Sequence, residues 1–316
     1  MSLKKTSIKT LKLLRPKQWI KNFAVFAAII FTGQLFNFPV LWNVCLGFLV
    51  FCAVSSSIYV VNDIFDVEKD RLHPFKRFRP LANKDLSVSY AIVVCAVLIA
   101  ASLLISLFIN IPFFFLVLIY LFLQLLYSAV LKHLPVLDIL TLAAGYMLRV
   151  YAGELTSTYH ISIWLVLTTV ALSLFLAVGK RKSELTLIAN FSESQIQATR
   201  KTLSHYSEQL LNVYISIFAT STFVFYSFFT FLENPKGLRI GLDVLMPDFL
   251  PAFFQRKWLM LTIVPVVFGI MRYLQDIYEK HEGESPERVF LTDTPLLVSV
   301  VVWIILVIGI IYLIGG

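Results

Sequence analysis

The sequence lacks the short motifs that mark many soluble enzymes. It contains no Cys-x-x-Cys pair, no phosphate-binding glycine loop and no His-Glu-x-x-His motif. Its five histidines are scattered, without the spacing of a zinc site or a catalytic triad. The three cysteines lie inside apolar runs, which favours small hydrophobic residues over a disulfide or a metal set. The chain therefore offers no zinc, P-loop or dithiol motif on which a function could rest.

Charged residues are also scarce. They make up 15% of the 316 residues, while 58% are hydrophobic, and no soluble domain of this size has that composition. We therefore expect a polytopic membrane protein. No short apolar stretch with a small-residue cleavage site follows the basic N-terminus, so we expect an uncleaved first span. The net charge of +8 is better explained by membrane topology and anionic headgroups than by nucleic acid, which is not an expected partner.

Nine hydrophobic segments are long enough to cross a bilayer. They are residues 20–36, 41–62, 88–109, 112–131, 136–153, 161–179, 210–232, 257–275 and 295–314. We predict an all-α fold with a single membrane domain over residues 1–316. Of the 27 Lys and Arg residues, 22 fall on the side of the N-terminus, four fall on the other side and one lies within a span. The positive-inside rule then places the N-terminus in the cytoplasm and the C-terminus outside.

The second predicted span ends in a row of acids, Asn62-Asp63-Ile64-Phe65-Asp66-Val67-Glu68-Lys69-Asp70. With about 100° per residue, Asn62, Asp63, Asp66 and Asp70 share one helical face and Glu68 points away from it. Carboxylates that converge repel one another unless a cation lies among them, and Mg²⁺ binds carboxylates, waters and phosphate oxygens. Acids at a membrane boundary can also simply face water. That alternative explains one or two acids better than four polar groups on one face.

A basic run follows the acids. It consists of Arg71, Lys76, Arg77, Arg79 and Lys84. Acids that hold a metal, followed by bases that neutralise phosphates, are typical of a diphosphate site. The two segments together therefore predict a diphosphate site at the cytoplasmic face.

Two ionisable residues lie within the fifth predicted span. Arg149 at mid-membrane costs about 2.5–3.5 kcal/mol on insertion scales, and the alternative is an interfacial Arg that snorkels. Asp138 lies eleven residues earlier, on nearly the same helical face and near the cytoplasmic end. The pair can line the same cavity, although it is too far apart for a direct bond in a straight helix.

The sixth predicted span ends in Gly179-Lys180-Arg181-Lys182-Ser183-Glu184. The spacing allows Lys180, Arg181 and Glu184 to share one face, which favours a site. Lys182 is interpreted as a solvated charge that stops the span. Arg272 and Asp276 repeat the spacing of four after the eighth span, where a surface ion pair and a site are equally supported.

These motifs together resemble the UbiA-type intramembrane prenyltransferases, and within that superfamily the decaprenyl-phosphate phosphoribosyltransferases. The matching pieces run along nearly the whole chain, at residues 15–22, 62–71, 73–80, 132–133, 136–139, 149–153, 173–185, 272–273 and 283–287. The acidic motif alone marks only the superfamily. The second loop departs from the Asp-x-x-x-Asp pattern of ordinary UbiA enzymes, because Lys180, Arg181 and Glu184 stand there. The resemblance implies a UbiA-like bundle of nine transmembrane helices.

The resemblance implies Mg²⁺-dependent transfer of 5-phosphoribosyl from phosphoribosyl diphosphate to a polyprenyl phosphate, at the cytoplasmic face of a bacterial inner membrane. Phosphoribosyl diphosphate carries an extra phosphate on its 5-carbon. Such a donor suits a site with one acidic motif and a basic second loop in place of a second acidic motif. In the implied site Asp63 and Asp66, with Asn62 and Asp70, hold the metal, and Asp63, Asp66, Lys180 and Arg181 are the catalytic residues. The substrate-binding residues are Lys17, Lys21, Asn62, Lys76, Arg77, Arg79, Lys132, Asp138, Arg149 and Glu184.

Two other functions stay open on the sequence alone. A UbiA-type enzyme could move a prenyl group from a prenyl diphosphate to an aromatic or other acceptor. A cation-coupled transporter could use the acids to bind its cation, but transporters place charges at mid-membrane in broken helices, and here the charges gather at one face. A homo-oligomer is compatible with any of these functions.

Overall fold

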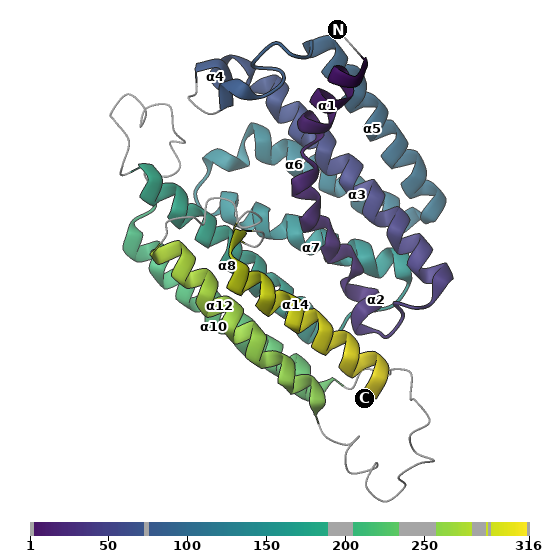
Figure 1. Ribbon diagram of the computed structural model, residues 1–316, viewed down its shortest axis with the longest axis vertical. Helices are drawn as coiled ribbons and strands as arrows, with labels where there is room; N and C mark the ends of the chain where they lie inside the picture. The colour runs from purple at the N-terminus through teal and green to yellow at the C-terminus, as the bar shows by residue number, and fades with distance from the viewer. Residues whose placement is uncertain are drawn as a thin grey trace, which may run out of the picture.

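A computed structural model of the chain describes residues 3–72, 76–188, 205–233, 257–279, 289 and 292–314 (Figure 1). The described residues form helices and no β-strand, which confirms the predicted fold class. The α-helices are α1 (Leu3–Leu14), α2 (Ala27–Phe31), α3 (Phe38–Phe65), α4 (Val67–Leu72), α5 (Val88–Ile109), α6 (Ile111–Ala129), α7 (Leu137–Ser157), α8 (Ile163–Ile188), α10 (Glu208–Leu232), α12 (Ile263–Tyr278) and α14 (Thr294–Gly309). The 3₁₀ helices are η1 (Pro16–Phe26), η2 (Lys76–Phe78), η3 (Leu131–His133) and η6 (Trp258–Thr262), and a π-helical turn, η7 (Ile310–Ile314), follows α14.

Seven helical segments of the described chain are long and apolar enough to cross a membrane. They are α3, α5, α6, α8, α10, η6 with α12, and α14 with η7. Two of the nine predicted spans are not among them. The segment 20–36 is divided between η1 and the short α2, and the segment 136–153 forms α7, which carries three charged residues. The fold is thus that of a multi-pass membrane protein, and the count of nine spans is not confirmed.

The N-terminal segment is irregular because its local sequence breaks an α-helix. Arg15 adopts a left-handed conformation, with φ of 52°, and Pro16 follows it at the first helical position. The chain then continues as η1, a 3₁₀ helix of 11 residues. Farther along, the backbone of η1 touches α7, because a methyl group at Gly153 would overlap the carbonyl oxygen of Val25. Only glycine allows this close approach.

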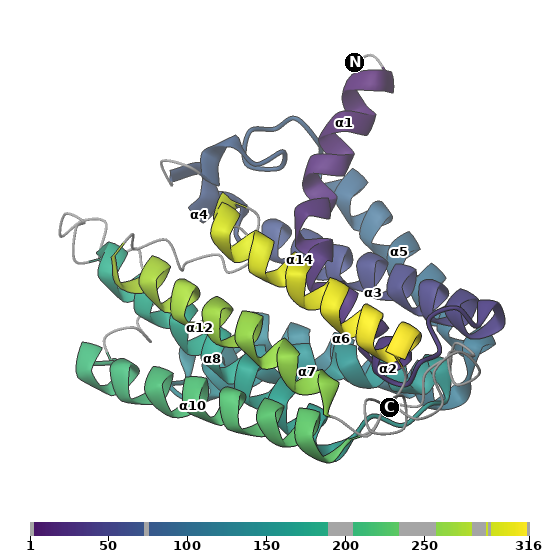
Figure 2. The same ribbon diagram turned by 60° about the horizontal axis from the view of Figure 1, so that its bottom comes forward.

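The helices form two adjoining groups (Figure 1). In the first group, η1, α3, α5, α6 and α7 pack around a core that includes Phe51 and Phe113. In the second group, α8, α10 and α12 pack around a core that includes Phe175 and Ile277. Helix α7 packs against α8 and joins the groups. The C-terminal ends of α3 and α8 lie at the same end of the bundle in both views (Figures 1 and 2), so both charged segments singled out in the sequence lie there.

The C-terminal turn η7 meets the segment that follows η1 on the opposite side of the bundle from these charges. The hydroxyl of Tyr312, in η7, donates a hydrogen bond to the carbonyl oxygen of Ile29 (2.9 Å) and accepts one from the backbone N–H of Leu35 (2.9 Å). The ring of Phe36 packs edge-on against Tyr312, with 5.1 Å between the centroids. The last turn of the chain therefore holds the segment that follows η1.

Candidate active site

The acidic motif lies where α3 gives way to α4. Helix α3 ends at Phe65, and Asp66 occupies a non-helical conformation between the two helices. The backbone N–H of Asp66 still bonds to the carbonyl of Asn62 (3.0 Å), and that of Asp70 bonds to the carbonyl of Asp66 (2.8 Å). The hydrogen bonds therefore keep a spacing of four residues across the break. They hold the acids close together at the helix end.

Two of the acids are neutralised by arginines from distant segments. The carboxylate of Asp63 forms ion pairs with Arg15, directly before η1, and with Arg79, where Oδ1 lies 3.1 Å from Nη1. The same Nη1 of Arg79 lies 2.6 Å from Oδ2 of Asp70. Both carboxylates are buried, with 2% and 5% of their side chains exposed, whereas both arginines are 27% exposed. We call Arg15, Asp63, Asp70 and Arg79 the acid cluster.

The remaining residues of the motif behave differently from one another. Asn62 and Asp66 are half-buried, and Asp66 has no side-chain hydrogen bond or ion pair with any residue in the described part of the chain. Glu68 is 82% exposed and pairs with Arg71 at 2.6 Å. The prediction that Glu68 points away from the other acids is confirmed.

The donor set of the acid cluster fits a divalent cation. No group of three or more His, Cys, Asp or Glu side chains is arranged for a metal ion among the residues that the structure describes. Asp63 and Asp70 nevertheless converge on one positively charged atom, Nη1 of Arg79. Mg²⁺ is usually held by one or two carboxylates and completes its shell with water and phosphate oxygens. Two converging carboxylates beside Asp66 satisfy that requirement.

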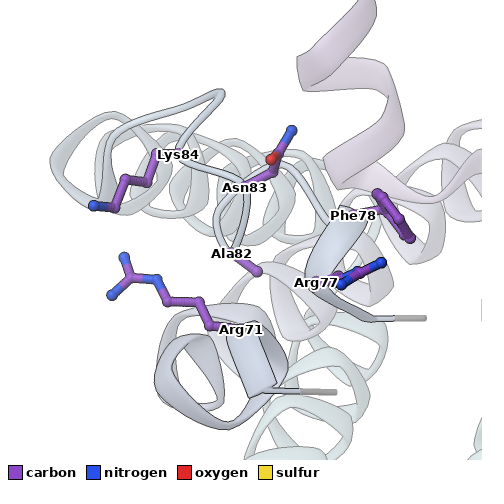
Figure 3. A pocket seen from close by; sticks show the side chains of 6 residues that line it. All are labelled: Arg71, Arg77, Phe78, Ala82, Asn83 and Lys84. Atoms are coloured by element: carbon purple, nitrogen blue, oxygen red, sulfur yellow. The ribbon is translucent and has the colours of Figure 1, made fainter. Parts of the chain in front are cut away.

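A basic surface adjoins the acid cluster. An open pocket of about 420 Å³ lies beside α4, and its charged lining residues are Arg71, Arg77 and Lys84 (Figure 3). Arg71 and Lys84 extend to one side of the pocket, while Arg77 extends toward Phe78, whose ring lies 4.9 Å from its guanidinium carbon. Among the predicted bases whose side chains the structure describes, only Arg79 contacts Asp63 or Asp70. The side chain of Lys76 lies outside the described residues.

Arg15 is a site residue that the sequence analysis missed. It was counted only among the N-terminal positive charges, yet its guanidinium reaches Asp63 and lies 5.1 Å from the ring centroid of Tyr59. Lys17 and Lys21, four residues apart in η1, do not share one face as they would in an α-helix. In a 3₁₀ helix such residues are about 120° apart, and Lys17 is exposed while Lys21 is half-buried.

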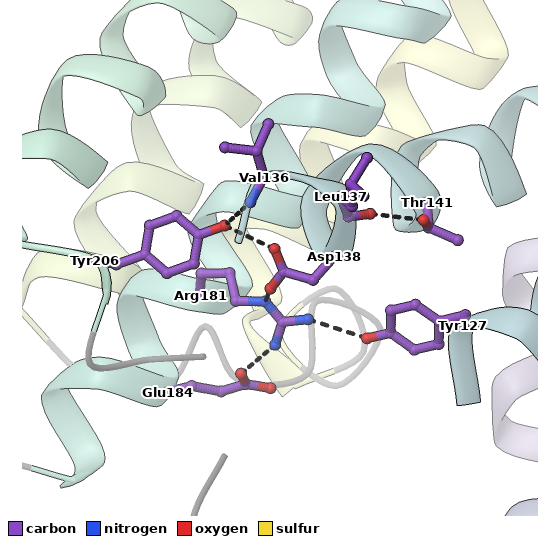
Figure 4. Close-up of polar contacts among 8 residues, drawn as sticks. All are labelled: Tyr127, Val136, Leu137, Asp138, Thr141, Arg181, Glu184 and Tyr206. Carbon is purple, nitrogen blue, oxygen red and sulfur yellow. Dashed lines mark hydrogen bonds and ion pairs between the residues drawn. The ribbon is translucent and has the colours of Figure 1, made fainter. Parts of the chain in front are cut away.

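A second charged cluster joins α6, α7 and α8 (Figure 4). Arg181 forms ion pairs with Asp138, where Nε lies 2.6 Å from Oδ2, and with Glu184. It also donates a hydrogen bond from Nη2 to the hydroxyl of Tyr127 (3.0 Å), and the hydroxyl of Tyr206 donates to Oδ1 of Asp138 (2.7 Å). We call these five residues the sealed cluster, because Arg181 and Asp138 are each only 1% exposed.

The sealed cluster changes the interpretation of Arg181. Its three guanidinium nitrogens already face Asp138, Glu184 and Tyr127, and no part of it is open to a phosphate in this arrangement. Burial and the hydrogen bond to Asp138 raise the pKa of Tyr206, which therefore stays a neutral donor. No sequence pattern indicates Tyr127 or Tyr206, because both contacts join segments far apart in the chain.

Lys180 and Lys182, on either side of Arg181, differ from each other. Lys180 is half-buried. Lys182 is 3% exposed: its ammonium contacts Asn212 and lies 3.4 Å from the ring centroid of Tyr278. The interpretation of Lys182 as a solvated stop charge is therefore wrong. It joins α8 to α10 and α12, and the aromatic ring compensates for part of its lost hydration.

Arg149 lies inside the first group of helices, away from both clusters. It donates hydrogen bonds to the side-chain oxygen of Asn22 (2.8 Å), the carbonyl of Gly145 (2.6 Å) and the hydroxyl of Tyr120 (2.7 Å). It is 6% exposed, so it does not snorkel. Arg149 and Asp138 thus belong to separate networks, and the suggestion that they line one cavity is not supported by their contacts.

The structure also shows the surroundings of Arg272 and Lys132. Arg272 does not pair with Asp276. It binds Asp293, the residue before α14, with Nε to Oδ1 at 3.0 Å and Nη2 to Oδ2 at 2.7 Å. The spacing of four was misleading because Asp276 is buried and Asp293 comes close through the fold. Lys132 lies half-buried in η3, between α6 and α7.

Comparison with known sequences gives matches over most of the chain. A family model described as the UbiA prenyltransferase family matches residues 22–292. A protein of Corynebacterium glutamicum named decaprenyl-phosphate phosphoribosyltransferase is 33% identical over 307 residues, which are 96% of this chain and 86% of that protein. A protein of the same name from Mycolicibacterium smegmatis is 34% identical over 298 residues, 93% of this chain and 89% of that protein.

Comparison with solved structures gives the same fold. A UbiA homolog from Archaeoglobus fulgidus, bound to GPP and Mg²⁺, superposes with a TM-score of 0.67. The match covers 95% of this chain and 99% of that one at 22% sequence identity. At 22% identity this match supports a shared fold and nothing further.

Proposed function

Because this chain belongs to the UbiA prenyltransferase family, we propose that it transfers the 5-phosphoribosyl group of phosphoribosyl diphosphate to a polyprenyl phosphate and releases diphosphate. Family membership makes the chain an enzyme, which removes the transporter alternative. The observation that carries the proposal is the acid cluster, where carboxylates for a metal and arginines for phosphates meet at one helix end. Its support comes also from relatives that carry this activity in their names and match the chain almost end to end.

In the proposed reaction the bond between C1 of the ribose and the diphosphate oxygen breaks, and a bond from C1 to an oxygen of the lipid phosphate forms. The lipid phosphate is already ionised near neutral pH, so no side chain has to remove a proton. Asp63, Asp66 and Asp70, with Asn62, hold Mg²⁺, which when bound neutralises charge on the leaving diphosphate. The buried position of Asp63 and Asp70 keeps water from competing for them.

The basic residues take the phosphates. Arg77 and Arg79, with Lys76, neutralise the diphosphate, because arginine forms bidentate contacts with phosphate oxygens. Lys180 meets the 5-phosphate, since it is half-buried beside the sealed cluster. Arg181 and Glu184 act as positioning residues that fix this end of α8.

Two further residues on η1 complete the acceptor side. Lys17 and Lys21 attract the lipid phosphate at the membrane surface, where the polyprenyl tail enters sideways between helices. Because the two side chains point in different directions, only one of them can contact the phosphate at a time.

We also propose nine membrane crossings with the N-terminus in the cytoplasm. A 3₁₀ helix rises about 2.0 Å per residue, so the 11 residues of η1 span about 22 Å and the five of α2 add about 7.5 Å. Together they reach the roughly 30 Å of the hydrocarbon core. In α7 the charged side chains have partners inside the protein: Arg181 forms an ion pair with Asp138, and Asn22 and Tyr120 accept hydrogen bonds from Arg149. A C-terminal reporter that is active only in the cytoplasm would contradict this topology.

The decisive experiment measures transfer directly with purified protein in detergent or nanodiscs. We expect Mg²⁺-dependent release of diphosphate from phosphoribosyl diphosphate, only when a polyprenyl phosphate is present, with labelled ribose entering the lipid phase. The control replaces the donor by a prenyl diphosphate with an aromatic acceptor. Turnover of that pair, with none of phosphoribosyl diphosphate, would replace the proposal by prenyl transfer.

A further inference from the structure

Arg79 occupies the position in the acid cluster that a cation would need. Its Nη1 lies 3.1 Å from Asp63 and 2.6 Å from Asp70, and no other described side chain contacts both carboxylates. The two acids are 2% and 5% exposed, so they need a positive charge to remain ionised in this place. The arginine supplies that charge whenever no metal is bound.

We propose that Arg79 is an exchangeable counter-ion: a divalent cation displaces it from Asp63 and Asp70, and the released guanidinium then binds the phosphate oxygens of the substrate. The inference rests on the proposed function for the identity of the substrate. It assigns to Arg79 two successive partners, first carboxylates and then phosphates. Metal and diphosphate therefore bind cooperatively, because each favours the released position of the same side chain.

Charge balance favours a divalent cation that replaces Arg79 over one that binds beside it. Asp63 and Asp70 carry two negative charges, and Arg15 and Arg79 carry two positive charges, so these four groups are neutral together. A divalent cation added beside both arginines would leave uncompensated positive charge in a half-buried site. Release of Arg79 removes one of those charges from the carboxylates, and a bound diphosphate neutralises the remainder.

The structure distinguishes Arg79 from Arg15 in its freedom to move. Arg15 pairs with Asp63 alone, lies over the ring of Tyr59 and precedes a helix that is seated against α7. Arg79 lies in the connection between η2 and α5. Its backbone carbonyl accepts a hydrogen bond from the backbone N–H of Asn83 (2.9 Å), and Leu81 is buried, so an exchange of partners needs only rotation of the partly exposed side chain and no movement of the backbone.

The test measures Mn²⁺ binding to the full-length protein, as loss of the spectroscopic signal of free Mn²⁺, with and without inorganic diphosphate. If Arg79 competes with the metal, Arg79→Gln should bind Mn²⁺ alone at least about five-fold more tightly than the unchanged protein. Diphosphate should tighten Mn²⁺ binding to the unchanged protein much more than to the variant, which lacks the guanidinium. Arg71→Gln is the matched control, because it removes a nearby arginine that pairs with Glu68 instead. It should change the affinity for Mn²⁺ in the absence of diphosphate by no more than about two-fold.

Arg79→Lys guards against a glutamine variant that fails to fold, since it retains the charge but loses the shared, planar contact. It should shift Mn²⁺ affinity in the same direction by a smaller factor. Unchanged or weaker Mn²⁺ binding in the Arg79 variants, or equal cooperativity with diphosphate in all proteins, would overturn the inference. No transfer step enters this test. A protein that shows the exchange yet fails to turn over phosphoribosyl diphosphate would retain the inference and lose the proposed function.

Discussion

The two arginine–carboxylate clusters lie at the same end of the bundle but differ in access to solvent. In the acid cluster the arginines are 27% exposed and come from an N-terminal segment and a loop. In the sealed cluster Arg181 and its partner Asp138 are each 1% exposed and come from two packed helices. An ion pair that solvent reaches can exchange its partners, whereas one that is enclosed loses stability if either partner is removed. The first cluster is therefore suited to binding ligands and the second to fixing helices.

The sealed cluster should respond most strongly in stability. Arg181→Met leaves the buried carboxylate of Asp138 without its counter-charge and removes the ion pair to Glu184, and we expect a loss of about 3–5 kcal/mol in the free energy of unfolding. Arg79→Gln should lose less, because Arg15 still pairs with Asp63 and because Arg79 itself is 27% exposed. Chemical unfolding in detergent measures both. Equal losses would remove the distinction between the clusters.

The acid cluster should respond most strongly in activity. Asp63→Asn removes a proposed metal ligand, and we expect turnover to fall by at least about 100-fold, or about 2.7 kcal/mol in activation free energy. The unfolding midpoint should change little by comparison. Glu68→Gln is the control, because its side chain is 82% exposed and faces away, and it should retain activity within about two-fold. An equally inactive Glu68→Gln would show that the assignment of the acids is wrong.

Gly153 tests whether the seat of η1 positions Arg15 in the acid cluster. A methyl group there would overlap the carbonyl of Val25, and we expect Gly153→Ala to cost about 1–3 kcal/mol in stability. It should also weaken diphosphate binding, since η1 must move. Gly309→Ala has open space around it and should be neutral or slightly stabilising. If Gly153→Ala has normal stability and binds diphosphate normally, the position of η1 does not control the acid cluster.

The smallest effect concerns the tie between α1 and the loop that carries Arg79. Lys9 bonds to Asp85 at 2.7 Å, and this hydrogen bond lowers the pKa of Asp85. A lowered pKa in the folded state stabilises the protein above the unfolded value of about 4 and loses that contribution as pH falls through the folded value. Asp85→Asn should therefore cost at most about 0.5 kcal/mol at pH 7. Unfolding should be measured at pH 7 and below pH 4. The difference in free energy of unfolding between Asp85→Asn and the unchanged protein should be smaller at the lower pH.

Much of the fold could be predicted because hydrophobic runs are local in sequence. The predicted span 88–109 matches α5, and 41–62 lies within α3. The first segment was harder, because η1 is a 3₁₀ helix that begins after the left-handed residue Arg15 and Pro16. Composition does not encode that conformation. The helical face that includes Asp63 and Asp70 was also predictable, since hydrogen bonds preserve its register across the break at Asp66.

Partners from distant segments could not be predicted in the same way. Arg15 lies 48 residues before Asp63, and its charge looked like one of many that mark the cytoplasmic side. Arg149 shows the opposite case: a charge in a span suggests a site, and the structure shows that Asn22, 127 residues away, and Tyr120 accept its hydrogen bonds inside the protein. Side-chain pairing over such separations depends on how helices pack, which periodicity does not report.

Tyr312 has a consequence for how the enzyme is made. Its hydroxyl bonds to Ile29 and Leu35, 283 and 277 positions earlier in the chain. During synthesis the N-terminal segment emerges first, yet these hydrogen bonds cannot form until η7 has been translated and inserted. Helix α2 can pack against α7 as soon as that helix is in place, but its hydrogen bond to Tyr312 cannot form before η7 does. The contacts of Tyr312 therefore form after the helices that carry the acids of the acid cluster have been made.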